Sequence, residues 1–322
     1  MMRITAFPLS MILMIPMAAQ VPDDQAPIIK VDVDVVNILC SVRDKHGAYI
    51  PNLTKDDFTI FEDGKPQTVR YFNREKDLAL TIGLLVDVSR SQENLIGVER
   101  QAAAQFFASV LGKKDMAFLI SFGAEAELLQ DYTNSHRLLR DALDQLRVNA
   151  PATGLQPGPV PTIYKPRGTV LFDAVYLATT DRLKGEVGRK AVVLITDGVD
   201  QGSRLTLQNA MSAAQKADTV IYSIYYVDPS EYGGRGSWGY TPSDSDLRKM
   251  SEETGGRLFR ASRKTPLEDI FRQLQEELRN QYAIGYTPAN PEKDGKFRKI
   301  EIRMHDKEWK VQARKGYFAV KP

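Results

Sequence analysis

The sequence predicts an α/β protein: a doubly wound, mostly parallel sheet with a small β segment at each end. Between residues 78 and 280, short apolar segments alternate with segments of helical period, as in parallel strands joined by crossover helices. Residues 28–72 and 281–320 alternate at period two instead, as antiparallel strands do. The 322 residues are 43% hydrophobic and 26% charged, which is enough apolar surface for one large core or two smaller ones.

The charge of the chain limits its possible partners, and its cysteine content limits how the fold can be stabilised. The net charge of +2, from 43 basic and 41 acidic residues, gives no electrostatic reason to expect a nucleic acid or an anionic membrane as partner. Cys40 is the only cysteine, so no intramolecular disulfide can form and the fold must be stabilised by its core.

The N-terminus predicts a secretory signal peptide at residues 1–20. Arg3 precedes the mostly apolar stretch 4–17, and Ala18 and Ala19 supply small residues for cleavage. Two prolines interrupt the stretch, which is too short for a convincing membrane span, although an uncleaved anchor is the alternative. We expect an exported protein without an integral membrane span after cleavage, in the periplasm, secreted or at the cell surface.

The first predicted β segment covers residues 28–75. Val31, Val33 and Val35 alternate with acidic residues, and Asp63-Gly64 is a hairpin turn signal.

The central domain is predicted at residues 78–280, and its elements follow from the two periods. Apolar runs predict its strands, and segments of helical period separate them. The expected strands are 80–86, 116–121, 126–131 as a short edge strand, 190–196, 219–227 and 257–260. The expected helices are 93–111, 135–147, 170–184, 204–217, 244–254 and 266–280.

The second β segment covers residues 281–322. Ile300, Ile302 and Met304 face one way there, and Glu301 and Arg303 face the other. A ribbon of two or three strands is not stable alone. We therefore predict that the two terminal segments pack together as one small, sandwich-like β domain into which the central domain is inserted.

Asp87, Ser89 and Ser91 are the most informative residues for function. They follow the apolar run 80–86 at alternate positions, so in an extended segment their side chains project to the same side. Oxygen ligands suit a hard cation such as Mg²⁺ or Ca²⁺ rather than zinc.

Two later residues strengthen this interpretation. Thr169 opens a helical segment, and Asp197 ends the apolar strand 190–196. Ligands of an open parallel sheet bind outside the carboxyl ends of its strands, where strand order reverses, so we expect these oxygens to meet there. Taken singly, such a hydroxyl commonly caps a helix and Asp197-Gly198 commonly forms a turn.

In this order, Asp87, Ser89, Ser91, Thr169 and Asp197 resemble the metal-ion-dependent adhesion site (MIDAS) of von Willebrand factor type A (VWA) domains, over roughly residues 78–280. The flanks resemble the VWFA-related proteins of acidobacteria at 53–58, 62–64, 254–257, 282–288 and 314–318. Arg167 departs from the pattern, because many A domains have a second glycine before the threonine.

The resemblance implies a Rossmann-like VWA fold and a divalent cation, with Mg²⁺ preferred and Mn²⁺ or Ca²⁺ as alternatives. Ser89 and Ser91 would be direct ligands, Thr169 a state-dependent one, and Asp87 and Asp197 would act through water. The partner would be a protein that presents an Asp or Glu carboxylate, and residues 151–166 are candidates for specificity.

We therefore predict an exported, non-enzymatic binding module of the adhesion type. One alternative is a structural or assembly subunit of an envelope complex that uses the metal for self-association. A metal-dependent hydrolase is the other, and it would need a general base or nucleophile, which no His, Cys or Lys beside the motif supplies.

Overall fold

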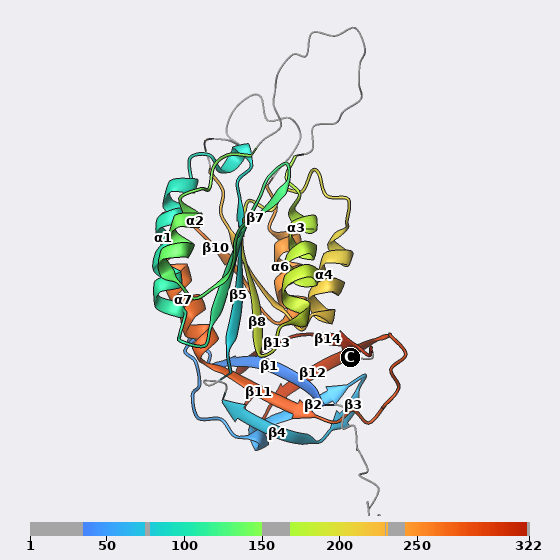
Figure 1. The fold of residues 1–322 in the computed structure, drawn as a ribbon. Helices are drawn as coiled ribbons and strands as arrows, with labels where there is room; N and C mark the ends of the chain where they lie inside the picture. The colour runs from blue at the N-terminus through green and yellow to red at the C-terminus, as the bar shows by residue number, and fades with distance from the viewer. Residues whose placement is uncertain (1–34, 75–77, 150–167, 229, 231–241, 321–322) are drawn as a thin grey trace, which may run out of the picture. The chain divides into compact units, whose positions relative to one another are not determined.

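The computed structural model describes residues 35–74, 78–149, 168–228, 230 and 242–320. The predicted signal peptide, the segment 151–166 and Arg167 lie outside these residues. The described chain forms one six-stranded sheet covered by helices and two four-stranded antiparallel sheets (Figure 1). This architecture confirms the predicted fold class. Within the same residues, no helix has the length and apolarity that a membrane crossing requires.

The six-stranded sheet has the order β10-β9-β8-β5-β6-β7, and only the β6–β7 pair is antiparallel. All residues of β5 and β8 are buried, as expected for central strands that are covered on both faces. The strands are β5 (Leu80–Asp87), β6 (Met116–Phe122), β7 (Ala126–Thr133), β8 (Arg189–Thr196), β9 (Val220–Tyr225) and β10 (Leu258–Arg260).

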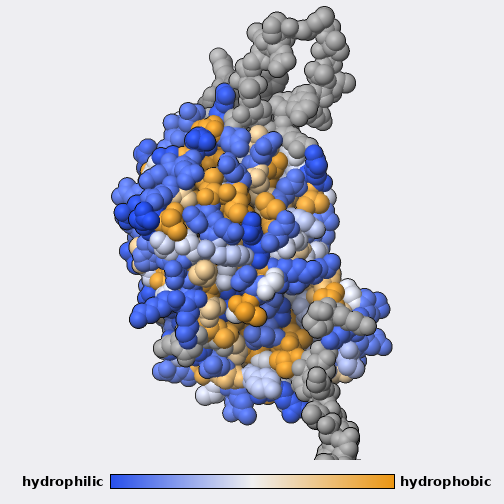
Figure 2. Space-filling view, in the orientation of Figure 1, coloured by the Kyte–Doolittle hydropathy of each residue, from blue (hydrophilic) through white to orange (hydrophobic). Residues whose placement is uncertain are grey.

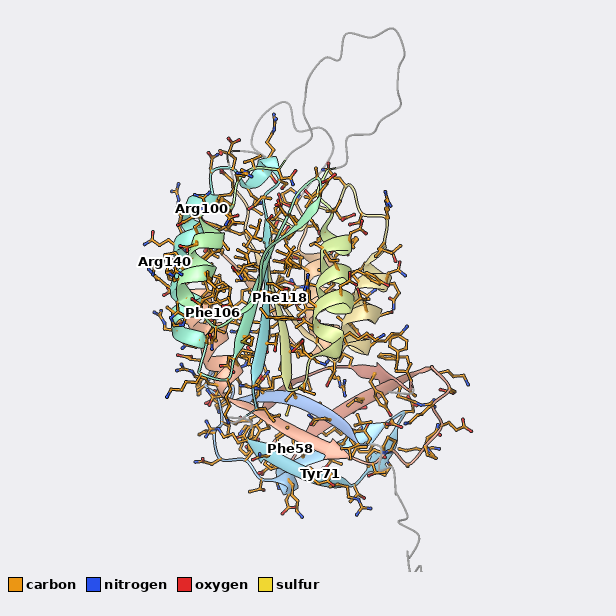
Figure 3. The ribbon with its side chains drawn as sticks, viewed as in Figure 1. Phe58, Tyr71, Arg100, Phe106, Phe118 and Arg140 are labelled. Atoms are coloured by element: carbon orange, nitrogen blue, oxygen red, sulfur yellow. The ribbon has the colours of Figure 1, made fainter. Side chains whose placement is uncertain are left out.

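Helices cover both faces of this sheet. One face carries α1 (Ile96–Val110), α2 (His136–Leu143) and α7 (Leu267–Arg279), and the other carries α3 (Leu171–Leu177), α4 (Leu207–Lys216) and α6 (Ser245–Thr254) (Figure 1). On the first face, Phe106 of α1 stacks on Phe271 of α7 with the ring centroids 4.6 Å apart. In the sheet, Phe118 packs edge-on against Tyr132 (Phe106 and Phe118 are labelled in Figure 3). The sheet therefore has an apolar core on each side.

The predicted helix 170–184 changes its winding. After α3 it continues as a π-helical turn, η3 (Ala178–Arg182), and then as a 3₁₀ turn, η4 (Leu183–Gly185). The hydroxyl of Thr179 donates to the carbonyls of Val175 and Tyr176, and that of Thr180 donates to Tyr176. Such bonds compete with the regular helical ladder, which explains why the winding changes at the two threonines.

The two antiparallel sheets combine strands from both ends of the described chain. Their orders are β13-β1-β11-β4 and β14-β12-β2-β3. The strands are β1 (Val36–Arg43), β2 (Phe58–Glu62), β3 (Lys65–Gln67), β4 (Val69–Arg74), β11 (Gln281–Tyr286), β12 (Phe297–Met304), β13 (Lys310–Ala313) and β14 (Gly316–Phe318), with the short turn η1 (Lys55–Asp57) before β2. The pairing of β1 with β11 and of β2 with β12 joins segments that are more than two hundred residues apart.

A third apolar core lies between these two sheets. Ile38 and Ile60 are fully buried in it, and Phe72 stacks on Tyr282 with centroids 5.4 Å apart. The predicted turn at Asp63-Gly64 is confirmed, since both residues have positive φ and join β2 to β3. On the outer surface, hydrophobic side chains lie among hydrophilic ones (Figure 2).

Candidate metal site at the carboxyl ends of β5 and β8

The candidate site lies where two neighbouring parallel strands end. Strands β5 and β8 are paired, with Val86 opposite Ile195. Asp87 is the last residue of β5, and Asp197 directly follows β8. From β5 the chain continues to β6 and β7 on one side of the sheet and later returns to β8 on the other. The two carboxylates therefore lie where strand order reverses, as the sequence predicted for its ligand residues.

Asp87 is fully buried and both of its carboxylate oxygens accept hydrogen bonds. The backbone N–H of Ser89 donates to Oδ1 over 2.9 Å, and the hydroxyl of Thr196 donates to Oδ2 over 2.5 Å. The Thr196 oxygen in turn accepts the N–H of Gly198 over 3.1 Å. These bonds tie the end of β5 to the end of β8.

A second set of bonds connects the two serines to Asp197. The hydroxyls of Ser89 and Ser91 are 3.1 Å apart, and Ser91 donates to Asp197 Oδ2 over 2.6 Å. The backbone N–H of Val199 donates to Asp197 Oδ1 over 3.0 Å. Four of the five predicted site residues thus belong to one hydrogen-bonded network.

The local conformation of the motif differs from the prediction. Ser89 is extended, but the following residues form a 3₁₀ turn, η2 (Arg90–Gln92). The prediction of an extended segment through Ser91 was therefore wrong. The turn carries Ser91 across to Asp197, so the side chains converge because of this turn and the second strand, and not through strand alternation alone.

Thr169, the fifth predicted residue, is held beside the loop that follows β8. Its carbonyl oxygen accepts the N–H groups of Gln201 and Gly202 over 3.0 and 3.1 Å. Its side chain is buried. The loop that begins at Asp197 therefore positions Thr169 through the backbone.

The chemistry of these residues fits a hard divalent cation. The set comprises two carboxylates and three hydroxyls, and all donor atoms are oxygens. Among the described residues, no group of three or more His, Cys, Asp or Glu side chains is arranged to hold a metal. A metal at this position would therefore depend on the hydroxyl ligands as well as on Asp87 and Asp197.

Burial and charge perturb the site. Burial raises the pKa of the Asp87 carboxyl above its usual range, and the nearby negative charge of Asp197 raises it further. Because a divalent cation would compensate both carboxylates, its binding would relieve this repulsion.

Two residues of this region were not identified from the sequence. Thr196 was assigned only to a strand, although its position directly before Asp197 is a signal that it ends beside the site. Glu99 lies on the buried face of α1 and is fully buried, and neither of its carboxyl oxygens has a hydrogen-bond partner among the described residues. The sequence feature that could have identified Glu99 is its place on the apolar face of the helix, three residues after Ile96 and three before Ala102, which are both buried.

Glu99→Gln is expected to change the pH dependence of stability. Burial raises the pKa of Glu99 well above its ordinary value, and the charge of Asp87 adds to the rise. Above about pH 4.3, the ordinary value for Glu, the unfolded chain loses this proton while the native protein retains it, so native stability falls as pH rises. The difference in free energy of unfolding, Glu99→Gln minus parent, should therefore increase from about pH 5 to pH 8. Urea unfolding in EDTA measures this difference.

The control for this prediction is Glu93→Gln, at an exposed position just before α1, which should change stability by less than about 0.5 kcal/mol. Parallel pH profiles for the parent and Glu99→Gln would contradict the prediction.

No protein-family model matches this chain, and no curated protein matches it. Solved structures do resemble it. BatB from Bacteroides thetaiotaomicron, a conserved hypothetical protein, is 15% identical, with 62% of this chain and 97% of that chain covered and a TM-score of 0.46. PTMP1 from the mussel byssus, with a zinc-occupied MIDAS motif, is 16% identical, with 66% and 48% covered and a TM-score of 0.49. The SpRpn10 VWA domain is 13% identical, with 61% and 95% covered and a TM-score of 0.40.

Proposed function

We propose that this protein is an exported, VWA-type binding module that captures an acidic group of a partner protein through a divalent cation. Mg²⁺ is the preferred cation, and Mn²⁺ or Ca²⁺ can replace it. The ligands are Asp87, Ser89, Ser91, Thr169 and Asp197, directly or through water. The partner presents an Asp or Glu carboxylate.

The observation that carries this proposal is the network at the ends of β5 and β8. Asp87, Ser89, Ser91 and Asp197 come from segments more than one hundred residues apart, and hydrogen bonds join them into one cluster of oxygens. If these residues only capped helices and turns, two buried carboxylates would not need to lie together. Burying two like charges next to each other is costly. A cation removes that cost.

The composition of the site favours binding of an anion. Two carboxylates balance the charge of a divalent ion, and the hydroxyls add dipoles without further negative charge. A bound Mg²⁺ would supply a Lewis-acid centre that readily retains exchangeable waters. A carboxylate of a partner can replace such a water, which gives metal-dependent protein binding.

Among the described residues, the hydrogen-bonded network includes no His, Cys or Lys side chain beside its carboxylates and hydroxyls. Among the described residues, the hydrogen-bond partners of Asp87, Ser89 and Ser91 are hydroxyls, a carboxylate and backbone N–H groups. This set supports a binding role over hydrolysis.

Metal addition is expected to stabilise the mature chain. A cation at 100 times its dissociation constant adds about 2.7 kcal/mol to the free energy of unfolding. Thermal unfolding in EDTA, Mg²⁺, Mn²⁺ and Ca²⁺ measures this gain, and calorimetry measures the affinity. Ser91→Ala and Asp197→Ala should abolish both signals. Ser109→Ala is the matched control, because among the described residues its hydroxyl donates to the carbonyl of Phe106 within α1 and to no other group.

No metal-dependent shift and no heat of binding in the parent would overturn the proposed function. Size measurement with and without EDTA tests the assembly alternative, since oligomers that dissociate in EDTA would support self-association through the metal.

Glutarate, a small dicarboxylate, tests whether the bound metal has an open coordination position. If glutarate replaces a metal-bound water of the Mn²⁺-loaded protein, the water-proton relaxation rate should fall as glutarate is added, which would support the open position. Unchanged relaxation at saturating glutarate would count against carboxylate capture.

A further inference from the structure

Thr196 joins the two halves of the candidate site, yet it is not one of its proposed ligands. It is the last residue of β8 and is fully buried. Its hydroxyl lies 2.5 Å from Asp87 Oδ2 and 3.1 Å from the backbone N of Gly198. One side chain therefore contacts both the first carboxylate and the turn that carries the second.

The direction of both bonds is determined by their chemistry. The Gly198 N–H can only donate, so it occupies a lone pair of the Thr196 oxygen. The single hydroxyl hydrogen then remains for Asp87, which accepts it. Because Ser89 N–H already donates to the other oxygen of Asp87, the carboxylate is restrained on both sides. Its rotation would break one of the two bonds.

We propose that Thr196 is a positioning residue, whose hydroxyl holds the Asp87 carboxylate and the Asp197-Gly198 turn in one arrangement and thereby sets the affinity of the site for its cation. The inference rests on the proposed function and adds a residue to it. Groups that orient the ligands of a metal site commonly change affinity by about 10- to 100-fold when they are removed.

The test compares Mg²⁺ and Mn²⁺ binding by calorimetry, at a temperature where every variant is folded. Thr196→Val keeps the shape of the side chain and removes the hydroxyl, and it should weaken binding by about 10- to 100-fold. Thr196→Ser restores the hydroxyl and should recover affinity close to that of the parent. A purely structural role would not predict this recovery in folded protein.

Thr179→Val is the matched control. Thr179 is also fully buried, but its hydroxyl bonds to carbonyls of its own helix. It should bind metal like the parent even if it is less stable. Equal losses in the two valine variants would overturn the proposal, because the effect would then follow general destabilisation.

The remaining outcomes separate this proposal from the proposed function. If the parent binds metal, Asp197→Ala does not, and Thr196→Val binds within about tenfold of the parent, the positioning role is overturned while the metal site stands. If the parent binds no metal, the proposed function and the positioning role of Thr196 are both overturned. If Thr196→Val does not fold, Thr196→Ala and Thr196→Ser carry the comparison, and equal affinities in these two overturn the role of the hydroxyl.

Discussion

Replacing Glu277 with alanine is expected to lower the free energy of unfolding by about 3–5 kcal/mol, because it leaves two partly buried positive charges without their carboxylate partner. The Glu277 side chain is 1% exposed. Its Oε2 atom accepts the hydroxyl of Tyr49 over 3.0 Å and Nη2 of Arg43 over 3.5 Å. Nε of Arg257 lies 3.1 Å away as an ion pair without hydrogen-bond geometry.

The position of this cluster explains the size of the expected effect. Glu277 lies on α7, Arg43 ends β1, and Arg257 precedes β10, so one carboxylate connects the six-stranded sheet and its helices with an antiparallel sheet. The side chains of Arg43 and Arg257 are 16% and 23% exposed, so neither is fully hydrated at its position. Both guanidinium groups then remain partly buried, which costs more than the loss of an exposed ion pair.

Glu276→Ala is the control for this prediction. Glu276 precedes Glu277 on the same helix but is exposed, and its replacement should change stability by less than about 0.5 kcal/mol. Urea unfolding of the two variants measures the difference. A loss below about 1 kcal/mol for Glu277→Ala would show that the cluster contributes no more than a surface pair does.

Gly198→Ala is expected to be the second large change, and Gly64→Ala provides its comparison. Both glycines have left-handed φ, 78° for Gly198 and 79° for Gly64, so both substitutions carry a strain of about 1–2 kcal/mol. A Cβ atom on Gly64 would meet nothing within 4 Å, whereas on Gly198 it would lie 2.2 Å from the carbonyl oxygen of Ser243. Only the substitution at Gly198 therefore forces the neighbouring backbone to move.

This steric conflict should add about 1–3 kcal/mol to the cost of Gly198→Ala over that of Gly64→Ala. Because the Gly198 N–H bonds to Thr196, the displacement should also weaken metal binding, while Gly64→Ala leaves binding unchanged. Chemical unfolding and calorimetry on both variants measure these effects. Equal costs for the two variants would contradict a tight approach at Gly198.

Much of the fold was predictable because its signals are local. The mostly apolar runs before Asp87 and Asp197 identified β5 and β8 as buried strands, and their boundaries agree with the structure within one residue. The Asp63-Gly64 pair identified its hairpin, since few other residues tolerate two positive φ angles. The change of winding at Thr179 was missed, because hydroxyl bonds to the preceding turn compete with a helical pattern without altering it.

The sequence by itself determined which residues are candidate oxygen ligands and that two of them, Asp87 and Asp197, lie at the ends of buried strands, because side-chain chemistry and hydrophobic period are local properties of the sequence. The tertiary structure alone decided that Thr196 bonds to Asp87, a residue 109 positions away, that Glu99 is buried without a hydrogen-bond partner among the described residues, and that Glu277 meets Arg43 across 234 positions. Such contacts depend on which strands become neighbours and on how helices are set against them. The packing of the whole core determines this arrangement, so it cannot be predicted from a local sequence pattern.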